Sequence, residues 1–157
     1  MKRMKRWVKI LLCIVLALVV LVGAYVAYVF IDYHRIGDMS LTPEGDAFAA
    51  ELTAGERYTV VSYNIGFGAY EDDYGFFMDG GTESWAWSKE RLTANVEAIA
   101  AFLAQRQANF YLVQEVDIDS TRSYHVDERQ PIYQALTGRG HVFAQNYDSP
   151  FVGKQQL

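Results

Sequence analysis

Residues 58–65 read YTVVSYNI, a run rich in β-branched and aromatic residues that has the length of one strand. Residues 89–106 carry apolar side chains at helical spacing, with polar residues between them, and predict an amphipathic helix. Residues 110–115, FYLVQE, predict a second, short buried strand. A strand, a helix and a strand in this order predict an α/β fold in which helices cover a sheet.

The flanking segments extend this pattern on both sides. Residues 66–88 contain five glycines and many aromatic residues and predict an ordered loop, whose tryptophans pack the loop itself. Its acidic triplet at residues 71–73 lacks the alternating ligand spacing of a calcium loop and predicts a solvated turn. Farther on, residues 131–139 predict a short helix and residues 141–146 a third strand.

An uncharged apolar stretch near the N-terminus predicts a membrane anchor. Residues 10–31 hold 22 residues without a charge, roughly 33 Å of helix against a hydrocarbon core of about 30 Å. The basic tail of residues 1–9 predicts a cytoplasmic N-terminus and an extracytoplasmic remainder at the cell membrane. The alternative is a cleaved signal peptide, but the apolar run is longer than an ordinary signal core. Residues 32–56 predict a juxtamembrane linker.

Charge and cysteine content exclude some classes of function. The formal net charge is −5 although basic residues crowd the first nine positions, so the rest of the chain is strongly acidic. An acidic domain lacks the cationic surface with which proteins bind polyanions in general. The composition does not exclude a phosphate-containing substrate whose negative charge is neutralised by a bound metal ion. Cys13 is the only cysteine, which excludes a disulfide or a thiolate metal site within one chain.

Two polar residues stand where the predicted strands leave the core. Asn64 ends the first strand and Glu115 ends the second. A carboxylate at the end of an apolar strand is costly unless it is paired, hydrogen-bonded or bound to a cation. Hard ions such as Mg²⁺ require oxygen ligands of this kind. The alternatives are a turn asparagine and a solvated glutamate.

Together these residues resemble a known pattern. Ser62-Tyr63-Asn64-Ile65 and Leu112-Val113-Gln114-Glu115-Val116 are similar to the strand-end motifs of the endonuclease/exonuclease/phosphatase superfamily. The resemblance implies a four-layer α/β/β/α domain, a two-sheet β-sandwich flanked by helices, of which residues 57–157 form the first part. It also implies hydrolysis of a phosphodiester or phosphomonoester in a nucleic acid, a nucleotide or a phospholipid head group. Glu115 would be the principal ligand of a divalent metal, Mg²⁺ or else Mn²⁺ or Ca²⁺, and Asn64 would help to position the metal or the phosphate.

Other stretches of the sequence resemble one subgroup of the superfamily, and several elements of the superfamily have no counterpart in this chain. FFMDGG, SKE, QEVDIDSTRSYH and AQNYDSPF look like a subgroup of bacterial membrane-anchored members. The catalytic His, the Asp-x-Asn element and the Ser-Asp-His element of the superfamily have no counterpart here. We therefore expect this chain to be an N-terminal fragment of the domain and inactive by itself. The alternatives are a noncatalytic anchored binding domain that retains the fold, and a small membrane protein outside the superfamily.

Four more residues are candidate substrate ligands. Arg122, Tyr124 and His125 lie in the polar loop that follows Glu115, and arginine suits bidentate phosphate binding. Asn146 ends the predicted third strand and would face the same site. An ordinary polar surface loop is the alternative for residues 117–128. The sequence indicates no protein partner.

Overall fold

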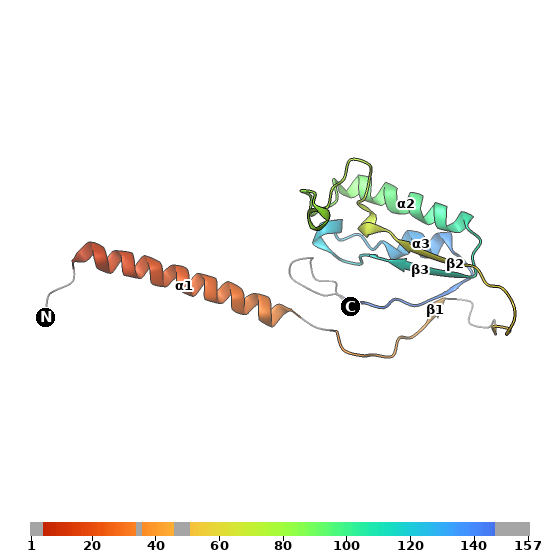
Figure 1. Ribbon diagram of the computed structural model, residues 1–157, viewed down its shortest axis with the longest axis horizontal. Helices are drawn as coiled ribbons and strands as arrows, with labels where there is room; N and C mark the ends of the chain where they lie inside the picture. Colours follow the sequence, from red (N-terminus) through yellow and green to blue (C-terminus); the bar gives the residue numbers. More distant parts are fainter. Residues whose placement is uncertain (1–4, 34–35, 46–50, 147–157) are drawn as a thin grey trace. The chain divides into compact units, whose positions relative to one another are not determined.

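The computed structural model describes residues 5–33, 36–45 and 51–146 of the chain. The chain divides into two compact units, residues 1–35 and residues 36–157. The first is a single apolar helix and the second mixes helices with two small sheets. Each unit is drawn in Figure 1, where the colours follow the sequence from red to blue.

The N-terminal unit confirms the predicted apolar helix. Helix α1 spans Arg6–Asp32, 27 residues, and none of them is buried within the chain. At the α-helical rise it is about 40 Å long, which exceeds the thickness of a hydrocarbon core. A helix of this length and composition near the N-terminus suits a membrane span and a signal sequence alike.

The second unit is built on two parallel strands. Strand β2, Val60–Asn64, pairs in parallel with β3, Phe110–Gln114, in a register that sets Asn64 opposite Gln114. Both predicted strands are confirmed, slightly shortened at their ends. Residues of one face, Val61 and Val113 among them, pack on a buried cluster that includes Leu103.

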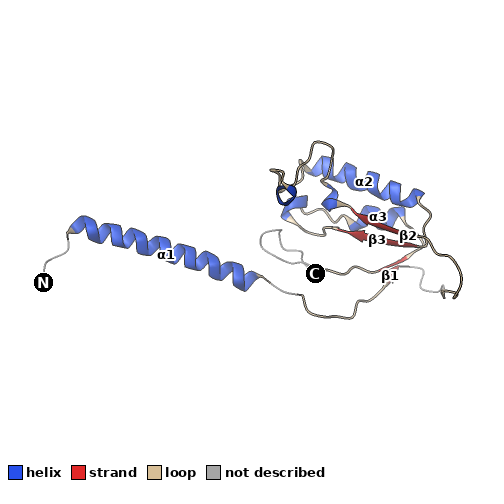
Figure 2. Cartoon of the chain, in the orientation of Figure 1, coloured by secondary structure: helices blue, strands red, loops and turns tan. Residues whose placement is uncertain are grey.

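Two helices cover that face of the sheet. Helix α2, Lys89–Gln105, confirms the predicted amphipathic helix and buries its residues at helical spacing: Leu92, Val96, Ala100 and Leu103. Helix α3, Arg129–Ala135, adds Ile132 to the same core as Ala100 and Leu103. The short helix was predicted over residues 131–139, but the structure starts and ends it earlier. Strand, helix, strand and helix thus form one layered α/β unit, as Figure 2 shows.

The start of α2 is capped by a serine side chain. Ser88 has extended backbone angles and its Oγ accepts a hydrogen bond from the backbone N–H of Arg91 at 3.2 Å. We expect Ser88→Ala to lower the free energy of unfolding by about 1 kcal/mol, because one amide of the first turn loses its acceptor. Urea unfolding of the full chain in detergent, followed by tryptophan fluorescence, measures the loss. Ser88→Asp, which keeps a capping oxygen, should be nearly neutral.

The prediction of a third strand over residues 141–146 is wrong in extent. Strand β4 holds only Gly140–His141, and residues 142–146 have no regular secondary structure. Strand β4 pairs antiparallel with β1, Glu44–Gly45, which lies in the predicted linker. The pairing brings the two backbones close together: a Cβ on Gly45, whose φ is +95°, would lie 2.5 Å from the carbonyl oxygen of Arg139.

Ring stacking supports this small sheet. The ring of Tyr133 in α3 stacks on that of His141 at 3.7 Å between centroids, so β4 is held against the helix before it. A strand of two residues is too short to show the alternation of apolar and polar side chains by which strands are predicted from sequence. The pairing with β1 therefore follows from packing rather than from the local sequence.

Candidate functional site

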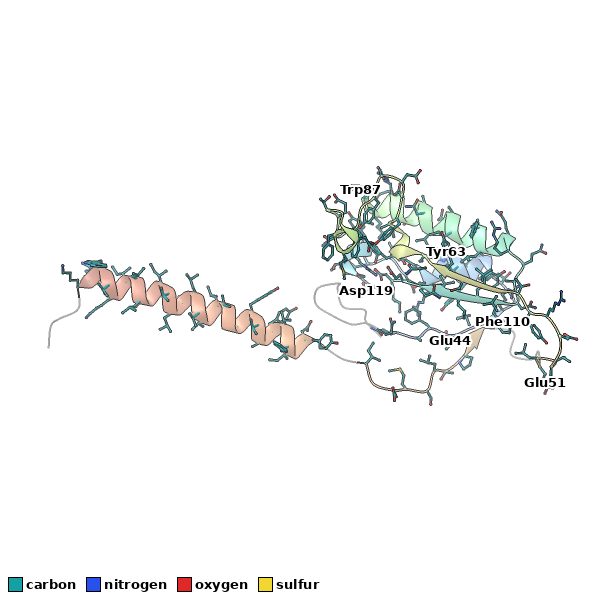
Figure 3. All side chains as sticks on the ribbon, viewed as in Figure 1. Glu44, Glu51, Tyr63, Trp87, Phe110 and Asp119 are labelled. Atoms are coloured by element: carbon teal, nitrogen blue, oxygen red, sulfur yellow. The ribbon has the colours of Figure 1, made fainter. Side chains whose placement is uncertain are left out.

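The two parallel strands bring Asn64 and Glu115 to one edge of the sheet. Asn64 is paired with Gln114, and Glu115 is the next residue along β3. The N–H of Ile65 continues the ladder by donating to the carbonyl oxygen of Gln114 at 3.0 Å. Figure 3 labels Phe110 at the amino end of β3, with Asp119 and Trp87 toward the opposite, carboxyl end. Ligands of open α/β sheets bind at this end of the strands.

Asn64 and Glu115 are in direct contact. Asn64 Nδ2 donates to Glu115 Oε1 at 2.8 Å, and Asn64 Oδ1 accepts from the backbone N–H of Gly66 at 2.9 Å. A carboxylate can only accept and a backbone amide can only donate, so this orientation of the asparagine amide is the one that satisfies both contacts. Glu115 Oε2 has no hydrogen-bond partner within the described part of the chain.

The backbone around the pair turns sharply. Glu115 has a φ of +55°, and its carbonyl oxygen accepts from the N–H of Phe67 at 3.0 Å. On the other strand, Gly66 has a φ of +54°, and a Cβ there would lie 2.3 Å from the ring of Tyr70. A left-handed glutamate is uncommon, and such residues often lie at functional sites. Both chain segments thus leave the sheet at the same place and are bonded to each other.

An ionic network lies beside this pair. Arg91 of α2 donates from Nε to both carboxylate oxygens of Glu71 at 3.0 Å and from a terminal nitrogen to Asp73 Oδ1 at 3.0 Å. Asn95 adds a hydrogen bond to Glu71 Oε1 at 2.9 Å. The Arg91 hydrogen bonds lower the pKa of both Glu71 and Asp73. The predicted solvated turn at residues 71–73 is confirmed, and the structure adds that Arg91 of α2 pairs with two of its three carboxylates at the surface.

Tyr70 and Asp79 form a second polar pair near the strand ends. The Tyr70 hydroxyl donates to the Asp79 carboxylate. Burial first, and then Asp79 and Glu115, raise the pKa of Tyr70. Tyr70, Asp79 and Glu115 all line an open cleft that also includes Asn64 and Arg91. Sequence reasoning missed this pair and Arg91, because no local motif marks them.

The loop after Glu115 places Arg122 in a structural ion pair. Arg122 donates from Nε and a terminal nitrogen to both carboxylate oxygens of Asp117, each at 2.8 Å. Its guanidinium also lies 3.9 Å from the centre of the buried Phe67 ring. Its side chain is 16% exposed. Arg122 lines a broad cleft with Glu115, and one bidentate edge of its guanidinium is bound to Asp117.

The other three predicted substrate ligands are scattered. The Tyr124 hydroxyl donates to the carbonyl oxygen of Ala86 at 3.0 Å, which ties the loop to residues 66–88. His125 is exposed and its Nδ1 lies 2.5 Å from Asp119 Oδ1. Neither Tyr124 nor His125 is among the residues that line the two clefts. Asn146 is exposed and lines the broad cleft that Glu115 also lines.

Glu128 is the most perturbed carboxyl group of the unit. It is fully buried, and its Oε2 accepts from the backbone N–H of Asp117 at 2.9 Å. Glu128 Oε1 is buried without a hydrogen-bond partner among the residues that the structure describes. Burial first, and then the charge of Asp117, raise the pKa of Glu128 to about 9. Sequence reasoning missed this residue, whose burial depends on how residues 117–128 fold.

Comparison of the chain with protein-family models, with curated proteins and with solved structures finds no match. Within residues 5–33, 36–45 and 51–146, no three His, Cys, Asp or Glu side chains are grouped so that they could hold a metal ion. The site is therefore defined by its own geometry, in which a carboxylate and an amide meet at the carboxyl ends of two parallel strands.

Proposed function

We propose that residues 57–157 belong to a divalent-metal-dependent phosphoesterase of the endonuclease/exonuclease/phosphatase superfamily. One observation carries the proposal: Asn64 and Glu115, the two residues on which the resemblance rests, are bonded at 2.8 Å although 51 positions separate them in the chain. The exposed face of the β2–β3 sheet, which carries Val60 and Leu112, suits the four-layer sandwich of that superfamily. The sandwich itself is part of the proposal.

The residues present fit a single hard cation. Glu115 Oε2 is a carboxylate oxygen without a hydrogen-bond partner among the described residues, and Mg²⁺ is often held by only one or two carboxylates, with water and substrate phosphate completing its shell. The side-chain nitrogen of Asn64 donates to Glu115 and its side-chain oxygen accepts from Gly66, so we assign Asn64 the role of orienting the Glu115 carboxylate. A bound metal would polarise a phosphoryl oxygen and stabilise the charge that develops during attack by water.

The substrate class follows from charge and placement. Residues 36–157 contain more than twice as many acidic as basic residues, which disfavours a long polyanion held by surface charge. Arg122, the cation nearest to Glu115 along the chain, is bound by Asp117. We therefore favour a phospholipid head group or an extracellular nucleotide over a long nucleic acid.

Metal binding is the direct test of the site. We expect Glu115→Gln to weaken the binding of Mn²⁺ by the full chain by more than the about 10- to 100-fold that loss of an outer-shell partner costs, because the neutral amide loses the anionic ligand. Asn64→Ala should weaken it less, through loss of the bond that orients the carboxylate. Electron paramagnetic resonance of free Mn²⁺ measures both. Glu97→Gln, which removes an exposed carboxylate of α2, is the matched control. Equal Mn²⁺ affinities of the Glu115→Gln and Glu97→Gln variants would show that Glu115 is not a ligand of the metal.

The membrane orientation belongs to the same proposal. We propose that α1 remains as an anchor, with a cytoplasmic N-terminus and the second unit outside, because basic residues precede the helix. After replacement of Cys13, a cysteine at the exposed position Ser40 is expected to react with a membrane-impermeant thiol reagent in intact cells. Labelling only after lysis would reverse the orientation, and release of the protein into the medium would indicate a cleaved signal sequence.

A noncatalytic anchored binding domain is the second candidate. The lack of a three-residue ligand group among the described residues is compatible with it. The two candidates differ in turnover. Magnesium-dependent hydrolysis of bis(p-nitrophenyl) phosphate that Glu115→Gln abolishes would establish the enzyme and would overturn the expectation that this chain is inactive by itself. Mn²⁺ binding that depends on Glu115 without any hydrolysis is expected of this chain under both candidates.

A further inference from the structure

Three large apolar side chains are exposed together on the loop of residues 66–88. Phe77 is 54% exposed, Met78 74% and Trp85 51%. We call these three residues the apolar tip. Phe77 and Met78 are neighbours in a short 3-10 turn, Phe77–Asp79, that ends at Gly80 in the left-handed conformation. Exposed apolar side chains that form a contiguous patch often mark an interaction surface.

The tip is held by a closed and well-packed base. The carbonyl oxygen of Gly75 accepts hydrogen bonds from the N–H groups of Thr82 at 3.0 Å and Glu83 at 2.9 Å. The N–H of Phe77 donates to the carbonyl oxygen of Glu83 at 2.8 Å. Behind the turn, the Phe76 ring packs edge-on against the fully buried Phe67 ring, with 5.6 Å between centroids. Phe77 and Met78 are therefore presented by a hydrogen-bonded turn, and Trp85 follows the residues that close it.

The same chain carries the surface that could cover this tip. Helix α1 has the length and composition of a membrane span, and residues 33–43 join it to β1 of the second unit. Fully extended, such a segment would reach at most roughly 40 Å, which permits the second unit to touch a bilayer that holds α1. Tethering also raises the effective concentration of the surface to about the millimolar range, so a weak contact is enough.

We propose that the apolar tip inserts into the head-group interface of the bilayer that anchors the chain. We propose further that the lipids at this interface are zwitterionic phospholipids. Partial burial of a Phe, Met or Trp side chain contributes on the order of 1 kcal/mol or more, and aromatic rings suit the head-group region. The acidic excess of residues 36–157, with Asp79 next to the tip, opposes an anionic lipid surface.

The contact would bring lipid to the candidate site. Phe77, Met78 and Trp85 line the same broad cleft as Tyr70 and Glu115. A head group next to the tip would thus lie at a cleft that Glu115 lines. This last step rests on the proposed function, whereas the membrane contact itself depends only on α1 spanning the bilayer.

Fluorescence in vesicles tests the contact on the full chain. Cys13 is replaced by Ser, Met78 by Cys, and the new thiol is labelled with a nitrobenzoxadiazole probe in phosphatidylcholine proteoliposomes. We expect the emission to shift to the blue, doxyl-labelled lipid to quench it, and iodide to quench it several-fold less than a probe at Gln105→Cys, an exposed position at the end of α2. Adding Phe77→Ser should reduce the lipid quenching, and vesicles rich in phosphatidylserine should reduce it as well.

Two outcomes would overturn the proposal. Iodide quenching at Met78→Cys equal to that at Gln105→Cys would show a tip in water. A blue shift that grows with protein density and is insensitive to doxyl lipid would show that a second copy of the chain covers the tip. The Mn²⁺ affinity of the Phe77→Ser variant separates this proposal from the metal site, because the tip does not contact Glu115 and the affinity should be unchanged.

Discussion

Replacing Arg122 with alanine is expected to lower the free energy of unfolding by about 3–5 kcal/mol, because it removes the cation from a buried ion pair. Asp117 is 1% exposed and receives two hydrogen bonds of 2.8 Å from the Arg122 guanidinium. Without Arg122, the Asp117 carboxylate would remain in the interior without that charge partner. The variant also loses the contact of the guanidinium with the Phe67 ring at 3.9 Å.

Urea unfolding of the full chain in detergent measures the effect, and two variants serve as comparisons. Arg122→Lys keeps the charge but not the bidentate geometry, so it should fall between the wild type and the alanine variant. Arg57→Ala removes an exposed arginine and should change the stability by less than about 0.5 kcal/mol. A loss below about 1 kcal/mol in Arg122→Ala would show that the pair behaves as a surface ion pair, and would return Arg122 to the candidates for phosphate binding.

Periodicity was sufficient to predict the α/β core. The strand at residues 58–65, the helix at 89–106 and the strand at 110–115 all lie within two residues of the observed β2, α2 and β3. Each is long enough to show its own pattern of buried and exposed residues. Strands β1 and β4 have two residues each, and they pair because Gly45 permits a close approach to Arg139. Such a contact has no local signal.

The contacts of the candidate site likewise fall into one that the sequence pattern could predict and others that it could not. Parallel pairing alone brings the ends of two neighbouring strands together, so the contact of Asn64 with Glu115 could be predicted once both were placed at strand ends. The Tyr70–Asp79 and Arg91–Glu71 contacts depend on the path of residues 66–88 across the end of the sheet. That path is set by tertiary packing, above all by the burial of Phe67.

Arg122 has a structural contact that the sequence did not indicate, and its predicted role as a substrate ligand stays a prediction. An arginine that follows the strand end at the candidate site suits phosphate recognition, but it suits a buried aspartate equally well, because both present paired oxygens. Asp117 is five residues before Arg122 and the turn Thr121–Ser123 brings them together. Glu128 then closes the loop by accepting from the Asp117 N–H, while its own N–H donates to the Asp117 carbonyl oxygen at 3.0 Å.

The raised pKa of the buried Glu128 carboxyl group predicts that the free energy of unfolding depends on pH near neutrality. Its pKa is raised to about 9 by burial and by Asp117, while Arg122 acts in the opposite direction. The folded state therefore keeps a proton on Glu128 that the unfolded state, with an ordinary carboxyl pKa, has released. Stability is full below the unfolded pKa and is lost as the pH rises toward the folded pKa. We expect the free energy of unfolding to fall by about 1.4 kcal/mol per pH unit between about pH 5.5 and 8.

Glu128→Gln separates this contribution from those of all other titrating groups. The amide keeps an oxygen that can accept from the Asp117 N–H, but it carries no titratable proton, so the slope should be lost. Relative to the wild type, the variant should gain about 3 kcal/mol of stability between about pH 6 and 8. Subtracting the two pH profiles, measured by urea unfolding of the full chain in detergent, removes the contribution of the three histidines, which both proteins share. Glu97→Gln, at an exposed position of α2, should follow the wild-type profile. Parallel profiles for Glu128→Gln and the wild type would mean that Glu128 is ionised in the folded state, with water or a counter-charge at the buried Oε1.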